Sequence, residues 1–374
     1  MRENQAMGII MPGKNRPLLG ALLDRRTVGA IPFGGRYRLI DFMLSNMVHS
    51  GIWNIGVITR NKYESLMEHL GSGRDWDLAR KDGGLTLLPP MLNDPASAMA
   101  RDSLYLLSDY RRFLTNQRAR YIVIAYANLV GQIDFDTALE QHIDTGADIT
   151  VLYNHIDDER ELGDEAIVYG FDGEGRVNDV TIGAAWNGPC DRSLGAIIIG
   201  KEKLLSCLAT MIPRNQGSIA RDLLQKGFGE MEIRGFRVEG YCRQIHDLRS
   251  YYSVSMELLD PAVRRQAFPL EKPVLTRVRD EVSAKYGLSS KVKNSLVADG
   301  CIIDGEIENC ILFRGVNVKK GARLSNCIIM QNSTIESNAS LSYVIADRRC
   351  YIKEGRILSG FESYPVVIGS DSVV

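Results

Sequence analysis

The sequence predicts an α/β domain built on a mostly parallel sheet, followed by a connector and a parallel β-helix. Short aliphatic runs alternate with helical patterns over the first two-thirds of the chain, prolines punctuate the next stretch, and a six-residue periodicity begins near residue 290. A chain of 374 residues is long for one hydrophobic core, so two domains are expected. We place them at residues 1–260 and 290–374, with a connector at residues 261–289.

Four aliphatic runs predict the strands of the α/β domain. They are residues 7–11, 52–59, 121–125 and 148–153, and an amphipathic stretch at residues 37–49 predicts a helix between the first two. Near-continuous apolar strands separated by helices indicate a parallel sheet that is covered on both faces. Sheets of this kind bind ligands at the carboxyl ends of their strands.

The connector is marked by three prolines, Pro261, Pro269 and Pro273. A proline lacks the backbone N–H and its ring clashes with the preceding helical turn, so residues 268–273 cannot continue a helix. The charge-mixed composition of residues 261–289 also differs from the periodic sequences on either side.

Apolar residues six apart predict the β-helix. Three such sets are Leu312, Val318, Leu324 and Met330; Ile329, Ile335 and Leu341; and Ile345, Tyr351 and Ile357. Small residues, Asn, Asp and Gly fill the intervals. Repeats of this length indicate stacked coils in which each coil turns one aliphatic side chain inward per side. A two-sheet domain is the alternative.

Composition excludes several classes of protein. A hydrophobic content of 45% and a net charge of −1 are those of an ordinary globular chain rather than a nucleic-acid binder. No apolar run reaches the length of a membrane span, and residues 1–4 do not begin a secretory signal. Seven scattered cysteines without a C-x-x-C pair indicate reduced thiols, so we expect a cytoplasmic protein. From the net charge and the absence of a long apolar run, we expect no nucleic-acid or membrane partner.

One motif points to a family. Residues 33–42 read FGGRYRLIDF and residues 43–52 continue MLSNMVHSGI. This stretch resembles, almost letter for letter, the N-terminal signature of ADP-glucose pyrophosphorylase (glucose-1-phosphate adenylyltransferase). The resemblance implies a nucleotidyltransferase-like (Rossmann-like) α/β domain with a C-terminal left-handed β-helix of hexapeptide-type repeats. It also implies an enzyme that makes ADP-glucose and pyrophosphate from ATP and glucose-1-phosphate in glycogen biosynthesis.

The phosphate-binding loop of that family is altered in this chain. Residues 13–19 read GKNRPLL where the family has roughly G-G-x-G-x-R-L, so one loop glycine remains. The family's loop arginine, which neutralises the pyrophosphate leaving group, falls on Leu18. The lysine of a later Lys-Pro pair falls on Val28, and Pro17 removes an amide donor.

The metal and sugar-phosphate positions differ as well. The resemblance places the family's two metal-binding aspartates on Asn128 and Gln244, and an amide cannot supply the negative charge that holds Mg²⁺ between phosphates. The lysine that grips the phosphate of glucose-1-phosphate falls on Gly183. Matches survive at Asp102, residues 193–195 and Asp222.

These departures favour a regulatory, noncatalytic-type subunit over a self-sufficient enzyme. We therefore expect no catalytic residue, metal or cofactor in this chain. By the resemblance, Mg²⁺ and ATP bind to a catalytic paralogue, and this chain would assemble with that paralogue into a hetero-tetramer. Without the paralogue, this chain would form a homo-oligomer instead.

Four arginines near the signature are candidates for a regulatory anion site. In the family, basic residues here and in the β-helix bind phosphorylated metabolites, and guanidinium groups suit phosphate geometry. Arg38 matches the family's arginine and is the first candidate, followed by Arg26, Arg25 and Arg36. Alternatively, Arg38 pairs with a carboxylate such as Asp41 and holds the following helix in place.

Two other functions remain open. One is an active nucleotidyltransferase with a rearranged metal site, which would recruit Asp102 or Asp247 near Asn128 and Gln244. The other is a sensor of phosphosugars or sugar nucleotides. An acyltransferase is disfavoured because residues 290–374 contain no histidine.

Overall fold

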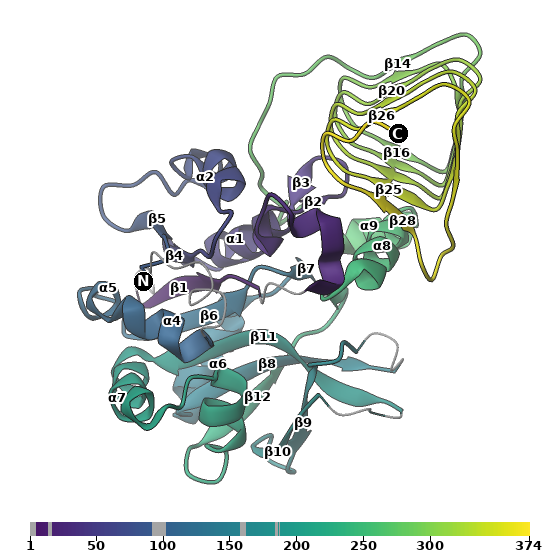
Figure 1. Cartoon of the computed structure of the whole chain (residues 1–374). Coiled ribbons are helices and arrows are strands. Elements are labelled where there is room, and N and C mark those ends of the chain that lie inside the picture. The colour runs from purple at the N-terminus through teal and green to yellow at the C-terminus, as the bar shows by residue number, and fades with distance from the viewer. Residues whose placement is uncertain (1–4, 14–16, 92–101, 158–161, 184–185, 187) are drawn as a thin grey trace.

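The computed structural model describes residues 5–13, 17–91, 102–157, 162–183, 186 and 188–374. Figure 1 shows an α/β domain that holds the N-terminal part of the chain and a β-helix that holds the C-terminal part. No helix among the described residues is long and apolar enough to cross a bilayer.

A nine-stranded sheet forms the core of the α/β domain. Its strands are β1 (Ala6–Met11), β4 (Asn54–Ile58), β5 (Gly84–Leu88), β6 (Tyr121–Tyr126), β8 (Ile149–Ile156), β9 (Ile167–Phe171), β10 (Val177–Ile182), β11 (Cys190–Gly200) and β12 (Ile233–Arg237). Strands β6, β1, β4 and β5 are parallel neighbours, and β8 and β12 form a second parallel pair. The four strands predicted from aliphatic runs are therefore confirmed as β1, β4, β6 and β8.

Strand β11 departs from the predicted parallel pattern. It runs antiparallel to both β6 and β8 and so joins the two parallel groups, while β9 and β10 form an antiparallel hairpin beside it. Its pairing with β8 shifts between Ser193 and Ala196, where Gly195 has a φ of +67°. A Cβ at Gly195 would lie 3.0 Å from the ring of Tyr126, so this bulge brings β11 close to the end of β6.

Helices cover both faces of the sheet. They are α1 (Leu39–His49), α2 (Glu64–Leu70), α4 (Ser103–Asp109), α5 (Arg111–Thr115), α6 (Phe135–Thr145) and α7 (Lys201–Met211). Helices α1, α2 and α6 bury apolar side chains on one face, and α4, α5 and α7 on the other. Helix α1 confirms the predicted amphipathic helix. It begins after Arg38, whose backbone N–H donates to the Asp41 carboxylate at 2.9 Å and so caps the helix.

A two-stranded antiparallel sheet, β7 (Leu129–Gly131) with β13 (Cys242–Gln244), lies below the signature region. After it, α8 (Leu248–Glu257) precedes the connector, whose first residues form α9 (Pro261–Ala267). Pro261 is the first residue of α9, a position where its missing N–H costs nothing. Residues 268–273 are not helical, as the prolines predict.

The C-terminal domain is a left-handed β-helix made of three sheets of five parallel strands. The first sheet is β14 (Lys285–Tyr286), β17 (Ile302–Ile303), β20 (Asn317–Val318), β23 (Thr334–Ile335) and β26 (Tyr351–Ile352). The second is β15 (Lys291–Lys293), β18 (Glu306–Glu308), β21 (Arg323–Ser325), β24 (Ser340–Ser342) and β27 (Ile357–Ser359). The third is β16 (Leu296–Val297), β19 (Ile311–Leu312), β22 (Ile328–Ile329), β25 (Val344–Ala346) and β28 (Val366–Ile368).

The register of the last coil differs from the sequence prediction. Tyr351 and Ile357, predicted to point inward, are 41% and 77% exposed, whereas Ile352 is buried inside the coils. The reason is coil length: Ile303 pairs with Val318, but Val318 pairs with Ile335 and Ile335 with Ile352. In this sheet the spacing between stacked residues changes from 15 to 17 instead of 18, so a strict six-residue repeat loses the inward face.

The third sheet of the β-helix packs against the α/β domain. Phe313, Met330 and Ile345 lie in one apolar cluster with α8 and with the signature residues Phe33 and Phe42. Met330 and Ile345, which the six-residue repeat also predicts to point into the coils, thus face the interface instead. Phe33, Leu39 and Phe42 of the signature thus belong to the cluster between the domains, whereas its other buried apolar residues pack in the cluster on the central sheet.

Candidate functional site

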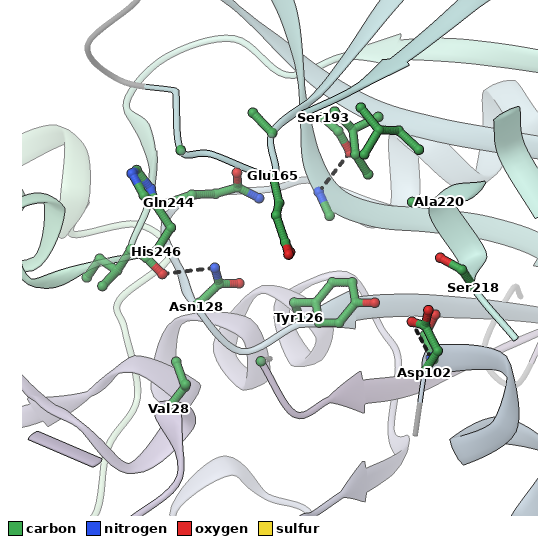
Figure 2. A pocket seen from close by; sticks show the side chains of 18 of the residues that line it. Val28, Asp102, Tyr126, Asn128, Glu165, Ser193, Ser218, Ala220, Gln244 and His246 are labelled. Atoms are coloured by element: carbon green, nitrogen blue, oxygen red, sulfur yellow. Dashed lines mark hydrogen bonds between the residues drawn. The ribbon is translucent and has the colours of Figure 1, made fainter. Parts of the chain in front are cut away.

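A cavity of about 210 Å³ opens beside the carboxyl end of β6. Tyr126, the last residue of β6, lies in its wall, as do Ser193 and Gly195 from the bulge in β11. Figure 2 shows these side chains together with those of Asn128, Gln244 and Glu165. The location is the one expected for a ligand site on a sheet with parallel strands.

The two altered metal positions meet in this cavity. Asn128 Nδ2 donates to the carbonyl of Ile245 at 3.0 Å, and the Ile245 N–H donates to the Asn128 carbonyl at 2.8 Å. Gln244, the preceding residue, ends β13 and lines the same cavity. The pairing of β7 with β13 therefore holds both amides at one site, although they are 116 positions apart in the sequence.

The altered phosphate and sugar positions lie in or beside the same cavity. Val28 lines it and is buried; a Cβ at Gly13 would lie 3.2 Å from the Val28 side chain. Leu18 is 47% exposed and does not line the cavity, whereas its neighbour Leu19 does. Gly183 follows the lining residue Ile182, and its N–H donates to the carbonyl of Ala166 at 3.0 Å.

Two of the surviving carboxylates have structural partners. Asp102 lines the cavity and caps α4 by accepting the Ser103 N–H at 2.9 Å. Asp222 lies beside the cavity and accepts N–H groups of Gly217 and Ser218 and the Lys226 ammonium at 2.7 Å. Burial alone would raise the pKa of Asp222, but these hydrogen bonds outweigh it and lower the pKa.

Glu165 is the functional candidate that the sequence analysis missed. Its carboxylate points toward the space between Asn128 and Tyr126 (Figure 2). It stands just before β9, outside any recognisable motif, and the sequence offers no signal for it. Asp247, by contrast, does not line this cavity; it caps α8 by accepting the Ser250 N–H at 2.6 Å.

The cavity is lined by neutral hydrogen-bonding groups as well as by the carboxylates of Asp102 and Glu165. Hydroxyl groups of Ser193, Ser218 and Tyr126 and the two amides surround it, and Arg221 contributes the one Lys or Arg side chain found among its described lining residues. Neutral amides do not fit the family's bridging metal. Within the described ranges, no group of three or more His, Cys, Asp or Glu residues is placed to hold a metal ion.

The structure places the four candidate arginines in different surroundings. The guanidinium of Arg26 is buried and lies 2.8 Å from both carboxylate oxygens of Asp347, and Arg25 forms an ion pair with Asp371. Arg36 is exposed, with its guanidinium over the ring of Tyr37.

Arg38 is bonded to helix α2. Its Nη1 donates to the Ser65 hydroxyl at 3.0 Å and to the Ser65 carbonyl, while its backbone N–H donates to Asp41. Burial, together with the neighbouring Arg348 guanidinium, lowers the pKa of Arg38 to about 10, so it remains charged at neutral pH. The Asp41 carboxylate thus accepts a hydrogen bond from the backbone N–H of Arg38 and does not form an ion pair with its guanidinium.

The fold and the cavity define a nucleotidyltransferase domain joined to a left-handed β-helix. Residues 21–180 match the family model described as nucleotidyl transferase, and residues 281–362 match the GlmU-like C-terminal hexapeptide model. The glycogen biosynthesis protein GlgD of Bacillus subtilis is 37% identical over 98% of this chain and 96% of its own length. GlgD of Geobacillus stearothermophilus is 34% identical, over 86% and 83%.

Adenylyltransferases are similar too. Glucose-1-phosphate adenylyltransferase of Thermotoga maritima is 31% identical over 84% of this chain and 75% of its own length. The chain belongs to the ADP-glucose pyrophosphorylase-like family.

Proposed function

We propose that this chain is a regulatory subunit of glucose-1-phosphate adenylyltransferase in glycogen biosynthesis and that it acts on a catalytic paralogue. The observation that carries the proposal is the pair Asn128 and Gln244. The fold brings both into the cavity where the family's metal-binding carboxylates belong, and both are neutral amides. The names of the GlgD relatives support the link to glycogen.

In this proposal, the chemistry takes place in the partner. Mg²⁺ and ATP bind to the catalytic subunit, where the metal neutralises the phosphates during adenylyl transfer. This chain lacks the corresponding carboxylates, and Leu18, Val28 and Gly183 leave the phosphates without the family's cations. Losing one such electrostatic contact lowers the catalytic rate constant by a factor of roughly 10²–10³, so several losses together should leave negligible activity. The reaction belongs to the cytoplasm, where ATP and sugar phosphates are found.

The chain would contribute interface contacts and a response to metabolites. Exposed apolar side chains on the last coil, Ile357, Phe361 and Tyr364, favour assembly with another chain. We infer a hetero-tetramer with the catalytic paralogue. Arg38, beside Arg348 of the β-helix, is the proposed contact for a phosphorylated effector.

The test measures ADP-glucose synthesis in three samples: this chain alone, the catalytic paralogue alone, and their mixture. The mixture should be more active or more responsive to effectors than the paralogue, and light scattering should detect a hetero-oligomer. The chain alone should be inactive at every Mg²⁺ concentration. Robust turnover by the chain alone, or the absence of any complex at micromolar concentration, would refute the proposal.

An active nucleotidyltransferase with a rearranged metal site is the second candidate. Glu165 and Asp102 favour it, because two carboxylates line the same cavity as Asn128 and Gln244. On this reading, Mg²⁺-dependent turnover by the chain alone should disappear in Glu165→Gln. Asp247→Asn is the matched control, since Asp247 lies outside the cavity.

A further inference from the structure

Two cysteines of the β-helix, Cys310 and Cys327, lie next to one another on adjacent coils. They stand just before β19 and β22, which are parallel neighbours with Ile311 paired to Ile328. The Ile311 N–H donates to the Cys327 carbonyl at 2.9 Å, so the pairing extends to the two cysteines. Neighbouring strands are about 4.8 Å apart, which lies within the range of roughly 4.4–6.8 Å between Cα atoms that a disulfide spans.

The two thiols have the same orientation. The Cys310 Sγ donates to the Glu308 carbonyl at 3.1 Å, and the Cys327 Sγ donates to the Ser325 carbonyl at 3.1 Å. Each cysteine follows an asparagine at the corner of its coil, with a φ of +51° or +53°. Both cysteines are 0% exposed and belong to the apolar cluster inside the coils. The sulfur atoms are therefore stacked on the inner side of one corner.

The other two cysteines of the β-helix have no such neighbour. Cys301 and Cys350 lie at one level of the first sheet, but Val316 and Ser333 occupy the two coils between them. Three strand spacings put Cys301 and Cys350 roughly 14 Å apart, too far for a disulfide. They are buried thiols of the same domain, so they provide a matched comparison for the stacked pair.

We propose that Cys310 and Cys327 form a disulfide between adjacent coils when the chain meets hydrogen peroxide. One thiolate attacks the O–O bond and becomes a sulfenic acid, and the displaced hydroxide takes up a proton to give water. The second thiolate attacks the sulfenic sulfur, the S–S bond forms, and hydroxide leaves and is protonated to a second water. Two thiols and one peroxide thus give one disulfide and two waters, with the cysteines oxidised and the peroxide reduced.

Cys310 is the residue that attacks the peroxide. Burial alone would raise its pKa, but hydrogen bonds from the side chain and the backbone N–H of Cys327 outweigh burial and lower the pKa of the Cys310 thiol. Burial and the neighbouring Cys310 raise the pKa of Cys327, which then serves as the resolving thiol. Because both thiols are buried, the reaction requires local opening of the corner and is slower than that of an exposed thiol.

The disulfide would lie directly behind a contact between the two domains. The hydroxyl of Tyr252 on α8 donates to the carbonyl of Asn326, the residue before Cys327, at 2.9 Å. The Tyr252 ring also packs against Tyr343 at the corner of the next coil, with 6.3 Å between ring centroids. Linking Cys310 to Cys327 restricts the unfolded chain, so oxidation would stabilise the coils that hold α8. This inference does not depend on the function proposed above.

Peptide mapping of the full chain tests the proposal. The folded chain is treated with hydrogen peroxide, its remaining thiols are alkylated, and it is digested with trypsin without a reductant. Mass spectrometry should find Cys310 linked to Cys327 at about tenfold or more the yield of any other cysteine pair, because stacked thiols meet at a high effective concentration. Dithiothreitol should remove the link. Peroxide treatment in urea should abolish the preference for this pair.

Variants of the four cysteines give the matched comparison. Cys301→Ser and Cys350→Ser should leave the yield of the link unchanged, whereas Cys310→Ser and Cys327→Val should abolish it. The replacements suit their positions, since the same place is occupied by a serine in the coil before Cys310 and by a valine in the coil after Cys327.

Thermal melting measures the effect on the fold. Peroxide should raise the melting temperature of the parent chain by about 5 °C, reversibly with dithiothreitol, and should not raise that of Cys327→Val. Three results would overturn the proposal: no link between Cys310 and Cys327 in the folded chain, a yield no higher than that of other pairs, or no rise in the melting temperature of the oxidised parent chain. All three are read from the parent chain, so they hold even if a variant fails to fold.

Discussion

Arg26 and Asp347 are separated by 321 positions in the sequence, yet a guanidinium nitrogen of Arg26 lies 2.8 Å from both carboxylate oxygens of Asp347. Each side chain is 1% exposed, and the Ser370 hydroxyl lies 2.6 Å from the same carboxylate. This ion pair fastens the segment before the signature to the last coils of the β-helix. It also occupies an arginine that the sequence alone suggests for effector binding.

Arg26→Met and Asp347→Asn should each lower the free energy of unfolding by roughly 3–5 kcal/mol, because either change leaves its partner buried and uncompensated. Chemical denaturation of the purified chain measures this. Arg25→Gln is the control: its ion pair with Asp371 is solvent-exposed and should be worth about 0–1 kcal/mol. Equal, small effects of all three changes would contradict the proposed role of the buried pair.

Arg38→Ala should reduce the response of the assembled complex to a phosphorylated effector. A charge-assisted hydrogen bond is worth roughly 1.5–3 kcal/mol, so the effector concentration required should rise about tenfold or more. Activity without effector should change little. Activation curves and melting temperatures are measured on one preparation. If the melting temperature falls while the effector response is unchanged, Arg38 serves only to hold α2 through Ser65.

Neighbouring residues of the last coil provide a test of its register. Ile352→Ala should cost about 2–5 kcal/mol of unfolding free energy, because Ile352 is buried between the three sheets. Tyr351→Ala should cost about 1 kcal/mol or less, since the ring is half exposed and its hydroxyl bonds only Glu336 at the surface. Urea unfolding compares the two variants. A larger loss of unfolding free energy in Tyr351→Ala than in Ile352→Ala would show that Tyr351 points inward, as the strict six-residue repeat predicts.

His142 should make the chain lose stability as the pH falls. It is buried on α6 with Nδ1 2.8 Å from the Thr150 hydroxyl, and burial lowers its pKa from 6.5 to about 4. Below pH 6.5 the His142 side chain binds a proton in the unfolded chain but not in the folded chain. The free energy of unfolding therefore falls between pH 6.5 and about pH 4.

His142→Gln should therefore lose less stability than the parent chain when the pH is lowered from 7 to 5. Urea denaturation at both pH values measures the difference. His49→Gln serves as the control, because the His49 ring bonds the Pro273 carbonyl at the exposed end of α1. An identical pH dependence in parent and His142→Gln would show that other groups carry it.

Much of the fold follows from local sequence patterns. Buried strands such as residues 121–126 are continuous apolar runs, and α1 carries its own helical periodicity, so both can be predicted without knowing the rest of the chain. Coil length is different: it depends on how many residues each corner of the β-helix accommodates. That is why the 17-residue spacing, and with it the exposure of Tyr351, was missed.

The site was only partly predictable for a related reason. Asn128 and Gln244 could be located because the family motifs around them remain readable. Glu165 lies in the cavity only because separate segments pack together, and it is not part of a repeated or charged pattern. The ion pair of Arg26 with Asp347 was equally unpredictable, since no local signal links positions so far apart.

The contact between the signature and the β-helix also has a consequence for biosynthesis. Ribosomes add about 5–20 residues per second, so on the order of tens of seconds pass between the synthesis of Arg26 and that of its partner Asp347. Until the β-helix is made, the apolar surface formed by Phe33, Phe42 and, once synthesised, helix α8 has no β-helix to cover it. We therefore expect the nascent α/β domain to be prone to aggregation until the β-helix has been made.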